Sequence, residues 1–361
     1  MSVNKKDNEP DDSKDESSAT AVHYHDYLQL DKLLNAQHPE SDKQNVAAHD
    51  EMLFIIIHQA YELWFKQLHH EADSVLNIMR KPSLNDNSPE MQTVVHRLNR
   101  MGVILRVLVH QIDILETMTP MDFLDFRDML RPASGFQSWQ FKLLEAKLGL
   151  KFEHRHGQAY YTKQLRSAHV DLIKEAEESS SLLQLVSEWL ERMPFFDDKE
   201  LWKDSVTTCD EHPFWEAYKA IYSISLAETE KDNIQFFDEV FFRQRESHYT
   251  FSAKANRAAL FIMLYRGYPL LQMPFQLLNQ LLDIDEQLST WRHRHMNMVH
   301  RMIGTRIGTG GSTGKDYLKA AADKHYIFKE IAQLTSFLIE RRRLPQLPKA
   351  VEKKLGFDVM Q

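Results

Sequence analysis

Apolar residues recur along most of this chain every three or four positions, the spacing that gathers side chains on one face of an α-helix. Glycine and proline number only 11 and 12 among 361 residues, so few of these stretches contain a helix breaker. The pattern predicts an all-α chain. The expected helices cover residues 50–79, 89–117, 171–193, 211–229, 234–247, 254–265, 274–303 and 315–343, with another that resumes after 132–135 and ends near 148.

The expected helix over residues 274–303 carries a histidine within its apolar stripe. At about 100° per residue, His295 projects to within roughly 40° of Trp291, whereas His293 and His300 fall near the opposite face. A histidine that faces a core needs a partner for its ring nitrogens, which can be a backbone carbonyl, a carboxylate or a metal ion. The helical phase therefore leaves two interpretations of His295, a satisfied core histidine and a ligand.

Residues 54–68, with the sequence FIIIHQAYELWFKQL, repeat this arrangement. His58 falls within a stripe that also contains Phe54, Tyr61 and Phe65 when the stretch is helical. A core histidine is again the simpler interpretation of the segment taken alone.

An arginine beside an aromatic residue marks the stretch after residue 117. Phe123 and Arg127 are four positions apart, so a helix turns both side chains the same way. Asp125 and Asp128 flank the arginine, and an ordinary ion pair with a carboxylate explains it equally well. The pattern leaves a binding role and a structural role open.

Glycine is concentrated in one place. Five of the 11 glycines fall between Gly304 and Gly314, in a stretch that also contains Thr and Ser. Such a loop lets the backbone approach a ligand closely and exposes N–H and hydroxyl groups to it. We interpret it as a flap over a small molecule, with a flexible connector as the alternative.

Composition narrows the class of protein. Hydrophobic residues make up 43% and charged residues 27% of the chain, as in a globular protein, and the net charge of −8 argues against general nucleic-acid binding. Residues 1–20 are polar and acidic, which predicts a disordered tail before a single domain over 21–361. The longest apolar run, 52–57, is too short to span a membrane. The single cysteine, Cys209, excludes an internal disulfide, and a cytoplasmic location is expected.

Several blocks of sequence together resemble the tryptophan 2,3-dioxygenase family. The resemblance extends from about Tyr24 to Tyr326, and the blocks occur in the family's order. They are YHDYLQLDKLLNAQ at 24–37, FIIIHQAYELWFKQL at 54–68, ETMTPMDFLDFRDML at 116–130, PASGFQSWQFKLLE at 132–145, MPFQLL at 273–278 and WRHRHMNMVHRMIGTRIGTGGSTG at 291–314.

The resemblance implies an all-helical fold around a b-type haem (iron protoporphyrin IX), assembled as a homotetramer. The implied reaction inserts dioxygen across the indole C2–C3 bond of L-tryptophan to give N-formylkynurenine. His295, the last residue of the WRxxH element, corresponds to the proximal iron ligand, which leaves the opposite haem face for dioxygen. The alternatives are the same haem fold acting on another indole or aromatic substrate, and a helical ligand sensor without catalysis.

The resemblance also implies roles for the residues around the substrate. His58 would accept a hydrogen bond from the indole N–H, while Phe54 and Phe123 would pack on the indole ring. Arg127 would clamp the substrate carboxylate through two parallel bonds. Thr309, within GTGG, would bind the ammonium or carboxylate group.

Further carried-over residues would complete the pocket. Ser134, in the SGFQ element, would line the haem pocket. Tyr24, Tyr27 and Leu28 would complete the substrate pocket of a neighbouring subunit, so that each site is built from two chains.

Two positions depart from the family's usual pattern. Lys142 stands where arginine is usual, and Trp139 stands where a smaller apolar residue is common. We expect both to lie beyond the pocket and to affect packing or haem-edge contacts at most.

Overall fold

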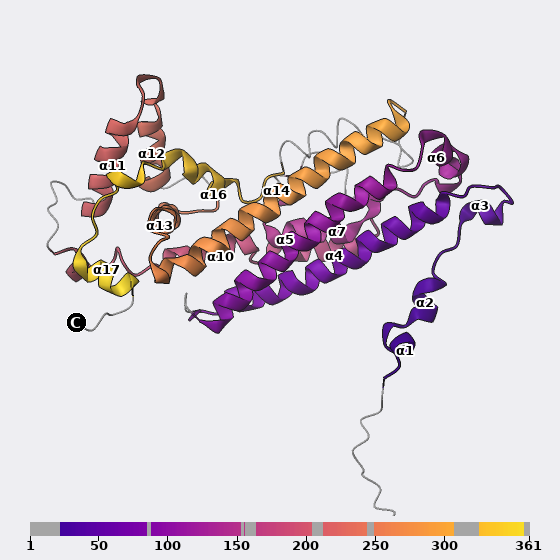
Figure 1. Ribbon diagram of the computed structural model, residues 1–361, viewed down its shortest axis with the longest axis horizontal. Coiled ribbons are helices and arrows are strands. Elements are labelled where there is room, and N and C mark those ends of the chain that lie inside the picture. Colours follow the sequence, from indigo (N-terminus) through magenta and orange to yellow (C-terminus); the bar gives the residue numbers. More distant parts are fainter. Residues whose placement is uncertain are drawn as a thin grey trace, which may run out of the picture.

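The computed structural model describes residues 22–84, 88–152, 155, 164–203, 212–243, 249–306 and 325–356 (Figure 1). Every regular element within these ranges is an α-helix or a short 3-10 helix, which confirms the all-α prediction. None of these helices is both long and apolar enough to cross a membrane. The α-helices are α1 (Tyr24–Leu28), α2 (Leu30–Leu34), α3 (Glu40–Lys43), α4 (Glu51–Met79), α5 (Pro89–Leu115), α6 (Pro120–Arg127), α7 (Trp139–Leu148), α9 (Ser167–Glu178), α10 (Leu182–Glu191), α11 (Pro213–Ser225), α12 (Asn233–Phe241), α13 (Ala253–Leu264), α14 (Pro269–Ile303), α16 (Lys329–Gln333) and α17 (Lys349–Leu355).

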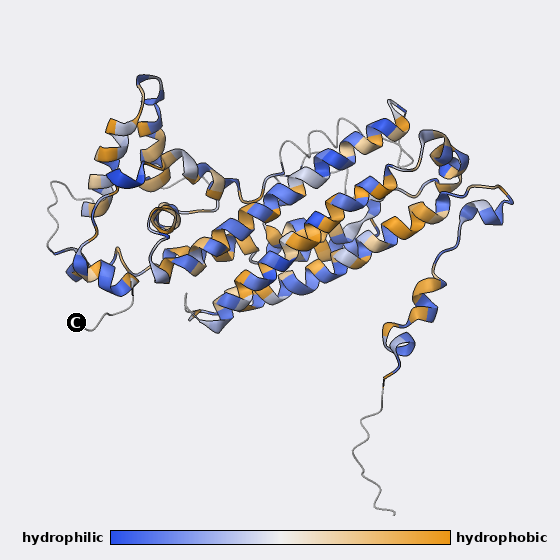
Figure 2. Cartoon of the chain, in the orientation of Figure 1, coloured by the Kyte–Doolittle hydropathy of each residue, from blue (hydrophilic) through white to orange (hydrophobic). Residues whose placement is uncertain are grey.

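Three long helices form the body of the molecule. α5 packs along both α4 and α14, and α7 packs against α4 (Figure 1). Figure 2 shows hydrophobic and hydrophilic residues alternating along these helices at turn-length spacing, as the sequence pattern predicted. Leu68, Leu98 and Leu288 are fully buried in this core, and the Tyr61 hydroxyl donates to the Leu108 carbonyl at 2.8 Å. This packing fixes the positions of α4 and α14 relative to each other, and side chains from both helices line one cavity.

A second group of helices, α10 to α13 with α16 and α17, lies toward the N-terminal end of α14 (Figure 1). Its core is aromatic, and Trp215, Phe237 and Phe241 are almost completely buried. Tyr218 is also buried and donates its hydroxyl hydrogen to the Phe337 carbonyl at 2.7 Å, so its polar end is satisfied. This group anchors the end of α14 opposite to His295.

The chain after the glycine-rich stretch docks on the side of α14. The Asp285 carboxylate accepts hydrogen bonds from the backbone N–H groups of Ile327 and Phe328 at 3.0 and 2.9 Å. About two turns further along α14, Arg292 donates to the His325 carbonyl at 2.8 Å. Residues 325–328 are therefore fixed against α14 by buried side chains. Thr309 lies outside the described residues.

The N-terminal arm, α1 and α2, projects away from the helical body (Figure 1). Its root is held to α4: Gln59 donates to the Ala36 carbonyl at 3.0 Å, and Glu51 accepts from the backbone N–H of Ser41 at 2.9 Å. Tyr24 and Tyr27 on α1 are 70% and 74% exposed. The apolar segment is not packed on its own subunit.

Most expected helices occur, and several differ from the expectation in position or extent. Residues 171–193 form two helices, because the chain breaks after α9 and Ser181 caps α10 by accepting from the Gln184 N–H. α14 begins five residues before Pro274, at Pro269, and Pro274 lies inside the helix. Asp50 immediately precedes α4, and its side chain makes no capping hydrogen bond.

The last long helix was predicted wrongly over the part that the structure describes. Residues 325–328 are not helical, α16 is only five residues long, and a 3-10 helix, η6 (Leu334–Phe337), follows it. The charged run at Arg341–Arg343 is a separate 3-10 turn, η7. Residues 325–328 instead use their backbone groups to bond with side chains of α14.

Candidate functional site

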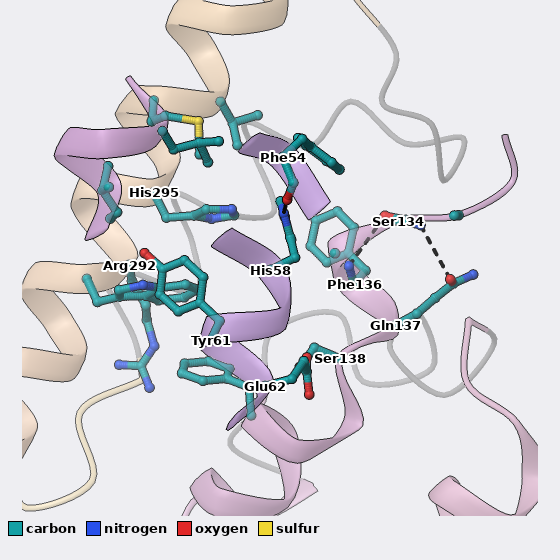
Figure 3. A pocket seen from close by; sticks show the side chains of 18 of the residues that line it. Phe54, His58, Tyr61, Glu62, Ser134, Phe136, Gln137, Ser138, Arg292 and His295 are labelled. Carbon is teal, nitrogen blue, oxygen red and sulfur yellow. Dashed lines mark hydrogen bonds between the residues drawn. The ribbon is translucent and has the colours of Figure 1, made fainter. Parts of the chain in front are cut away.

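A cavity of about 640 Å³ lies between α4, α6, α7, α14 and the 3-10 helix η2 (Gly135–Gln137) (Figure 3). Its lining is mostly apolar and includes several aromatic rings. Six residues singled out from the sequence line it together: Phe54, His58, Phe123, Arg127, Ser134 and His295. Side chains from positions as far apart as 54 and 295 thus share one space, as the resemblance implied.

His58 lies in the middle of α4, and its ring nitrogen Nδ1 is 2.7 Å from the Phe54 carbonyl oxygen. A carbonyl only accepts hydrogen bonds, so we assign the ring proton to Nδ1. Burial lowers the pKa of His58, and the neutral ring therefore predominates near pH 7. Nε2 then carries a lone pair and can accept a hydrogen bond from an N–H group.

Aromatic rings stand beside His58. The centre of the Phe54 ring is 4.2 Å from that of the His58 ring and 5.7 Å from that of the Phe123 ring. The two phenylalanine rings are stacked, with an angle of 29° between their planes. Rings at these separations make a narrow apolar wall. A flat aromatic molecule with one N–H group matches this part of the cavity.

His295 projects from α14 into the space that His58 enters from α4 (Figure 3). The Trp291 ring stacks on it at 4.9 Å, with only 5° between the planes. Burial, and to a smaller extent the proximity of the His58 ring, lowers the pKa of His295 to about 4, so its imidazole is neutral near pH 7. Its Nδ1 is buried without a hydrogen-bond partner among the described residues.

The other two histidines of this helix behave as the helical phase predicted. His300 is exposed to solvent. The Nδ1 atom of His293 is 2.9 Å from the Ser289 carbonyl, one turn earlier on the same helix. Neither residue lines the cavity, so His295 is the histidine of α14 that is available to a ligand there.

Arg127 is the last residue of α6, a helix that starts with a reciprocal cap between Thr119 and Asp122. Its side chain lines the cavity and is only 4% exposed. Asp128, one candidate for an ion pair with it, is paired with Arg131 at 3.1 Å. The short capped helix positions Arg127 beside Phe123, where a buried guanidinium can bind a carboxylate.

Ser134 precedes η2 and fixes the shape of that turn. Its hydroxyl accepts a hydrogen bond from the Phe136 N–H at 3.4 Å, and its own N–H donates to the Gln137 side-chain oxygen at 3.4 Å (Figure 3). The reciprocal cap holds the SGFQ turn against the cavity. Ser134 thus lies in the wall of the cavity.

A buried group of charged side chains at the cavity wall was not foreseen from the sequence. We call Glu145, Arg155, Arg292 and His325 the ionic cluster. Glu145 accepts from Arg292 at 2.6 Å and from Arg155 at 2.8 Å. Burial alone would raise the pKa of Glu145, but the two arginines outweigh it and hold the pKa at about 2. The cluster ties α7 to α14 three residues before His295.

The expectation that Trp139 and Lys142 lie beyond the pocket was wrong. Both line the cavity, because α7 starts at Trp139 directly after the SGFQ turn, and positions three apart share a helix face. Trp139 also stacks on His169 of α9, with ring centres 4.9 Å apart. Lys142 is 8% exposed and donates to the Phe136 carbonyl.

The remaining residues carried over from the resemblance are not brought to this cavity by the described chain. Tyr24, Tyr27 and Leu28 lie on the exposed arm. The structure adds Tyr61 and Glu62 to the cavity wall. These two follow His58 by three and four positions, so the helical period could have identified them.

Comparisons with known proteins identify the family of the chain. The family model for tryptophan 2,3-dioxygenase matches residues 8–338. The chain is 45% identical to the tryptophan 2,3-dioxygenase of Bdellovibrio bacteriovorus, over 93% of this chain and 98% of the relative. It is 41% identical to that of Dictyostelium discoideum, over 95% and 90%, and 37% identical to that of Mus musculus, over 98% and 92%. The chain belongs to the tryptophan 2,3-dioxygenase family.

Proposed function

We propose that the protein is a haem b-dependent dioxygenase that inserts dioxygen across the indole C2–C3 bond of L-tryptophan to give N-formylkynurenine. The observation that carries the proposal is the single cavity that His58 and His295 enter from two helices, with Arg127 in its wall. The names of the relatives from bacteria, amoeba and mouse support the reaction and the substrate.

The cavity residues fit a haem. His295 offers a neutral imidazole, and the described ranges contain no group of three or more His, Cys, Asp or Glu side chains suited to a bare metal ion. A haem iron brings four ligands of its own, so one histidine is sufficient to hold it. The aromatic and aliphatic lining suits the faces of the macrocycle, and Ser134 is assigned to its pocket. When bound, the haem supplies the iron that activates dioxygen.

The other residues bind and orient the substrate. Nε2 of His58 accepts a hydrogen bond from the indole N–H, and Phe54 and Phe123 pack on the indole ring. Arg127 binds the carboxylate through two parallel charge-assisted bonds. Thr309 binds the ammonium or carboxylate group, an assignment that rests on its GTGG motif. Holding both ends of the amino acid fixes the indole ring for reaction.

His58 is assigned to orientation and not to obligatory proton removal. Carbon C3 of an indole is electron-rich while the ring nitrogen keeps its proton, so attack there requires no base. The proton on Nδ1 of His58 is committed to the Phe54 carbonyl, which keeps Nε2 as an acceptor. His58 therefore sets the angle of the indole and excludes water from its N–H.

The direct test uses haem-loaded protein and L-tryptophan in air. The expected result is a growing near-ultraviolet absorption band of N-formylkynurenine together with loss of tryptophan. Consumption of a different indole in preference to tryptophan contradicts the proposed substrate, and absence of any turnover contradicts the proposed activity.

His58→Ala should slow the reaction without abolishing it. A neutral hydrogen bond contributes a net of about 0.5–1.5 kcal/mol, so we expect kcat/KM to fall by roughly two- to tenfold. His70→Ala is the matched control, because His70 is exposed on the same helix. A complete loss of activity in His58→Ala, with haem and tryptophan still bound normally, assigns His58 an obligatory role in proton transfer instead.

We further propose a homotetramer in which Tyr24, Tyr27 and Leu28 complete the pocket of a neighbouring subunit. Exposed aromatic side chains on a projecting arm require a surface that covers them. A second copy of the chain supplies such a surface, and by symmetry each of the two subunits then covers the arm of the other. The hydrogen bonds from α4 to the arm root direct the arm away from its own body (Figure 1).

Deleting residues 1–30 should raise the KM for tryptophan while haem content stays close to that of the full-length protein, because His295 belongs to the helical body. Deleting residues 1–20 is the control and should leave both unchanged. Mixing the 1–30 deletion with Arg127→Ala protein should restore partial activity if subunits exchange, since one combination has both an intact arm and an intact Arg127. A fully active monomer lacking residues 1–30 contradicts the shared site.

A further inference from the structure

Three cationic side chains, Lys142, Arg155 and Arg292, line the cavity wall near the ionic cluster. The two arginines donate to protein acceptors, although the Nε atom of Arg292 has no hydrogen-bond partner among the described residues. Arg292 donates to Glu145 and to the His325 carbonyl at 2.6 and 2.8 Å. Arg155 donates to Glu145 at 2.8 Å and to the Lys142 carbonyl at 2.9 Å.

Lys142 is engaged differently. Its ammonium group has three N–H bonds, and the hydrogen bond that the described chain provides is to the Phe136 carbonyl. The nearby carboxylates of Glu145 and Glu62 act on it through space, but hydrogen bonds tie them to Arg292 and Gln140 respectively. Lys142 is thus a buried cation at the cavity wall with capacity for a further acceptor.

Burial of the Lys142 ammonium group costs free energy. A buried ammonium loses its hydration, and the loss is offset only when an anion or enough acceptors surround it. Burial lowers the pKa of Lys142 to about 8, which reflects incomplete compensation by the groups around it. An anionic group on a molecule bound in the cavity would offset the part of the desolvation cost that the protein's own groups do not offset.

We propose that Lys142 binds a carboxylate side chain of the haem. The proposal rests on the proposed function, since it requires a haem in this cavity. Arg127 is not the residue for that carboxylate, because it ends α6 beside Phe123, whereas Lys142 lies on α7 beside the ionic cluster. Arg127 and Lys142 therefore offer cationic groups on different helices, one for the carboxylate of the amino acid and one for the carboxylate of the cofactor.

The alternative to carboxylate binding is a purely structural role for Lys142. By donating to the Phe136 carbonyl, Lys142 also supports η2 and the turn that carries Ser134. A support of that kind would help any macrocycle to bind, with or without carboxylates. Haem and haem dimethyl ester, whose carboxylates are blocked, distinguish the two roles.

The experiment titrates haem-free protein with each macrocycle and measures the dissociation constant from the Soret band and from quenching of tryptophan fluorescence. Lys142→Met removes the charge at similar side-chain length. We expect it to weaken haem binding by roughly ten- to hundredfold, the effect of losing one charge-assisted hydrogen bond, and to weaken ester binding by less than about threefold. Lys142→Arg should keep most of the affinity for haem.

Two further variants control the experiment. Lys147→Met removes a lysine of the same helix that pairs with Asp73 and does not line the cavity, and it should change neither constant. Lys142→Gln removes the charge and keeps an N–H donor for the Phe136 carbonyl on a slightly shorter side chain. It should reproduce the selective loss even if Lys142→Met folds poorly.

Equal weakening of both macrocycles, or no weakening of either, overturns the role of Lys142 in carboxylate binding while leaving the proposed function intact. Failure of the unaltered protein to bind haem overturns the proposed function, and this inference with it. The outcomes are separable because the first compares variants that all bind a macrocycle and the second concerns the parent protein alone.

Discussion

His295→Ala should abolish the Soret band of protein purified with haem, or leave a spectrum without histidine ligation. His295 presents a neutral imidazole to the cavity from α14, and the histidines beside it on that helix do not line the cavity. Removing the ring leaves the macrocycle without an iron ligand from the protein, held only by the apolar lining and by the contact proposed for Lys142. Absorption spectra and the haem-to-protein ratio measure the loss.

His300→Ala and His293→Ala are the matched controls, and both should keep the haem. His300 is exposed, and His293 contacts the Ser289 carbonyl of its own helix. Loss of haem in His300→Ala together with retention in His295→Ala contradicts the ligand assignment and the helical phase on which it rests.

Arg127→Lys should raise the KM for L-tryptophan by roughly ten- to hundredfold. Lysine keeps the positive charge but replaces a planar fork with a point charge, so two parallel bonds to a carboxylate cannot form. A bond to a charged group contributes about 1.5–3 kcal/mol, which sets the size of the effect. Steady-state kinetics at saturating dioxygen measure it.

Tryptamine, which lacks the carboxylate, separates a binding role from a structural one. Its affinity should be the same in the parent protein and in Arg127→Lys, since the lost interaction is with the carboxylate alone. Unchanged binding of both L-tryptophan and tryptamine assigns Arg127 to internal ion pairing, the interpretation that Asp125 and Asp128 first suggested.

The long helices could be predicted because each buries one face for many turns. α4 and α5 begin and end within about two residues of the expected limits, since the apolar period stops there. Residues 325–328 could not be predicted in the same way. Their backbone N–H groups bond to Asp285, a residue more than 40 positions earlier, and this tertiary contact replaces a local helix.

The site residues differ in the same way: some stand out from a local pattern, and others depend on tertiary contacts. His58 and His295 stood out because each interrupts an apolar stripe on one helix, which is a local pattern, but a core histidine explained that pattern as well, and only the family resemblance assigned the two residues to a site. The ionic cluster did not stand out, since Arg292 and Glu145 meet only after α7 and α14 pack together. Lys142 was misplaced because its departure from the family pattern does not reveal which face of α7 borders the cavity.

The measurement that tests the central claim most directly is the mass of the product formed from L-tryptophan under ¹⁸O-labelled dioxygen. A dioxygenase that opens the indole C2–C3 bond places both atoms of one dioxygen molecule in N-formylkynurenine. We expect a product with two labelled oxygens from the haem-loaded protein and no product from His295→Ala. A product with one labelled oxygen, or labelled oxygen at another position of an intact indole, contradicts it.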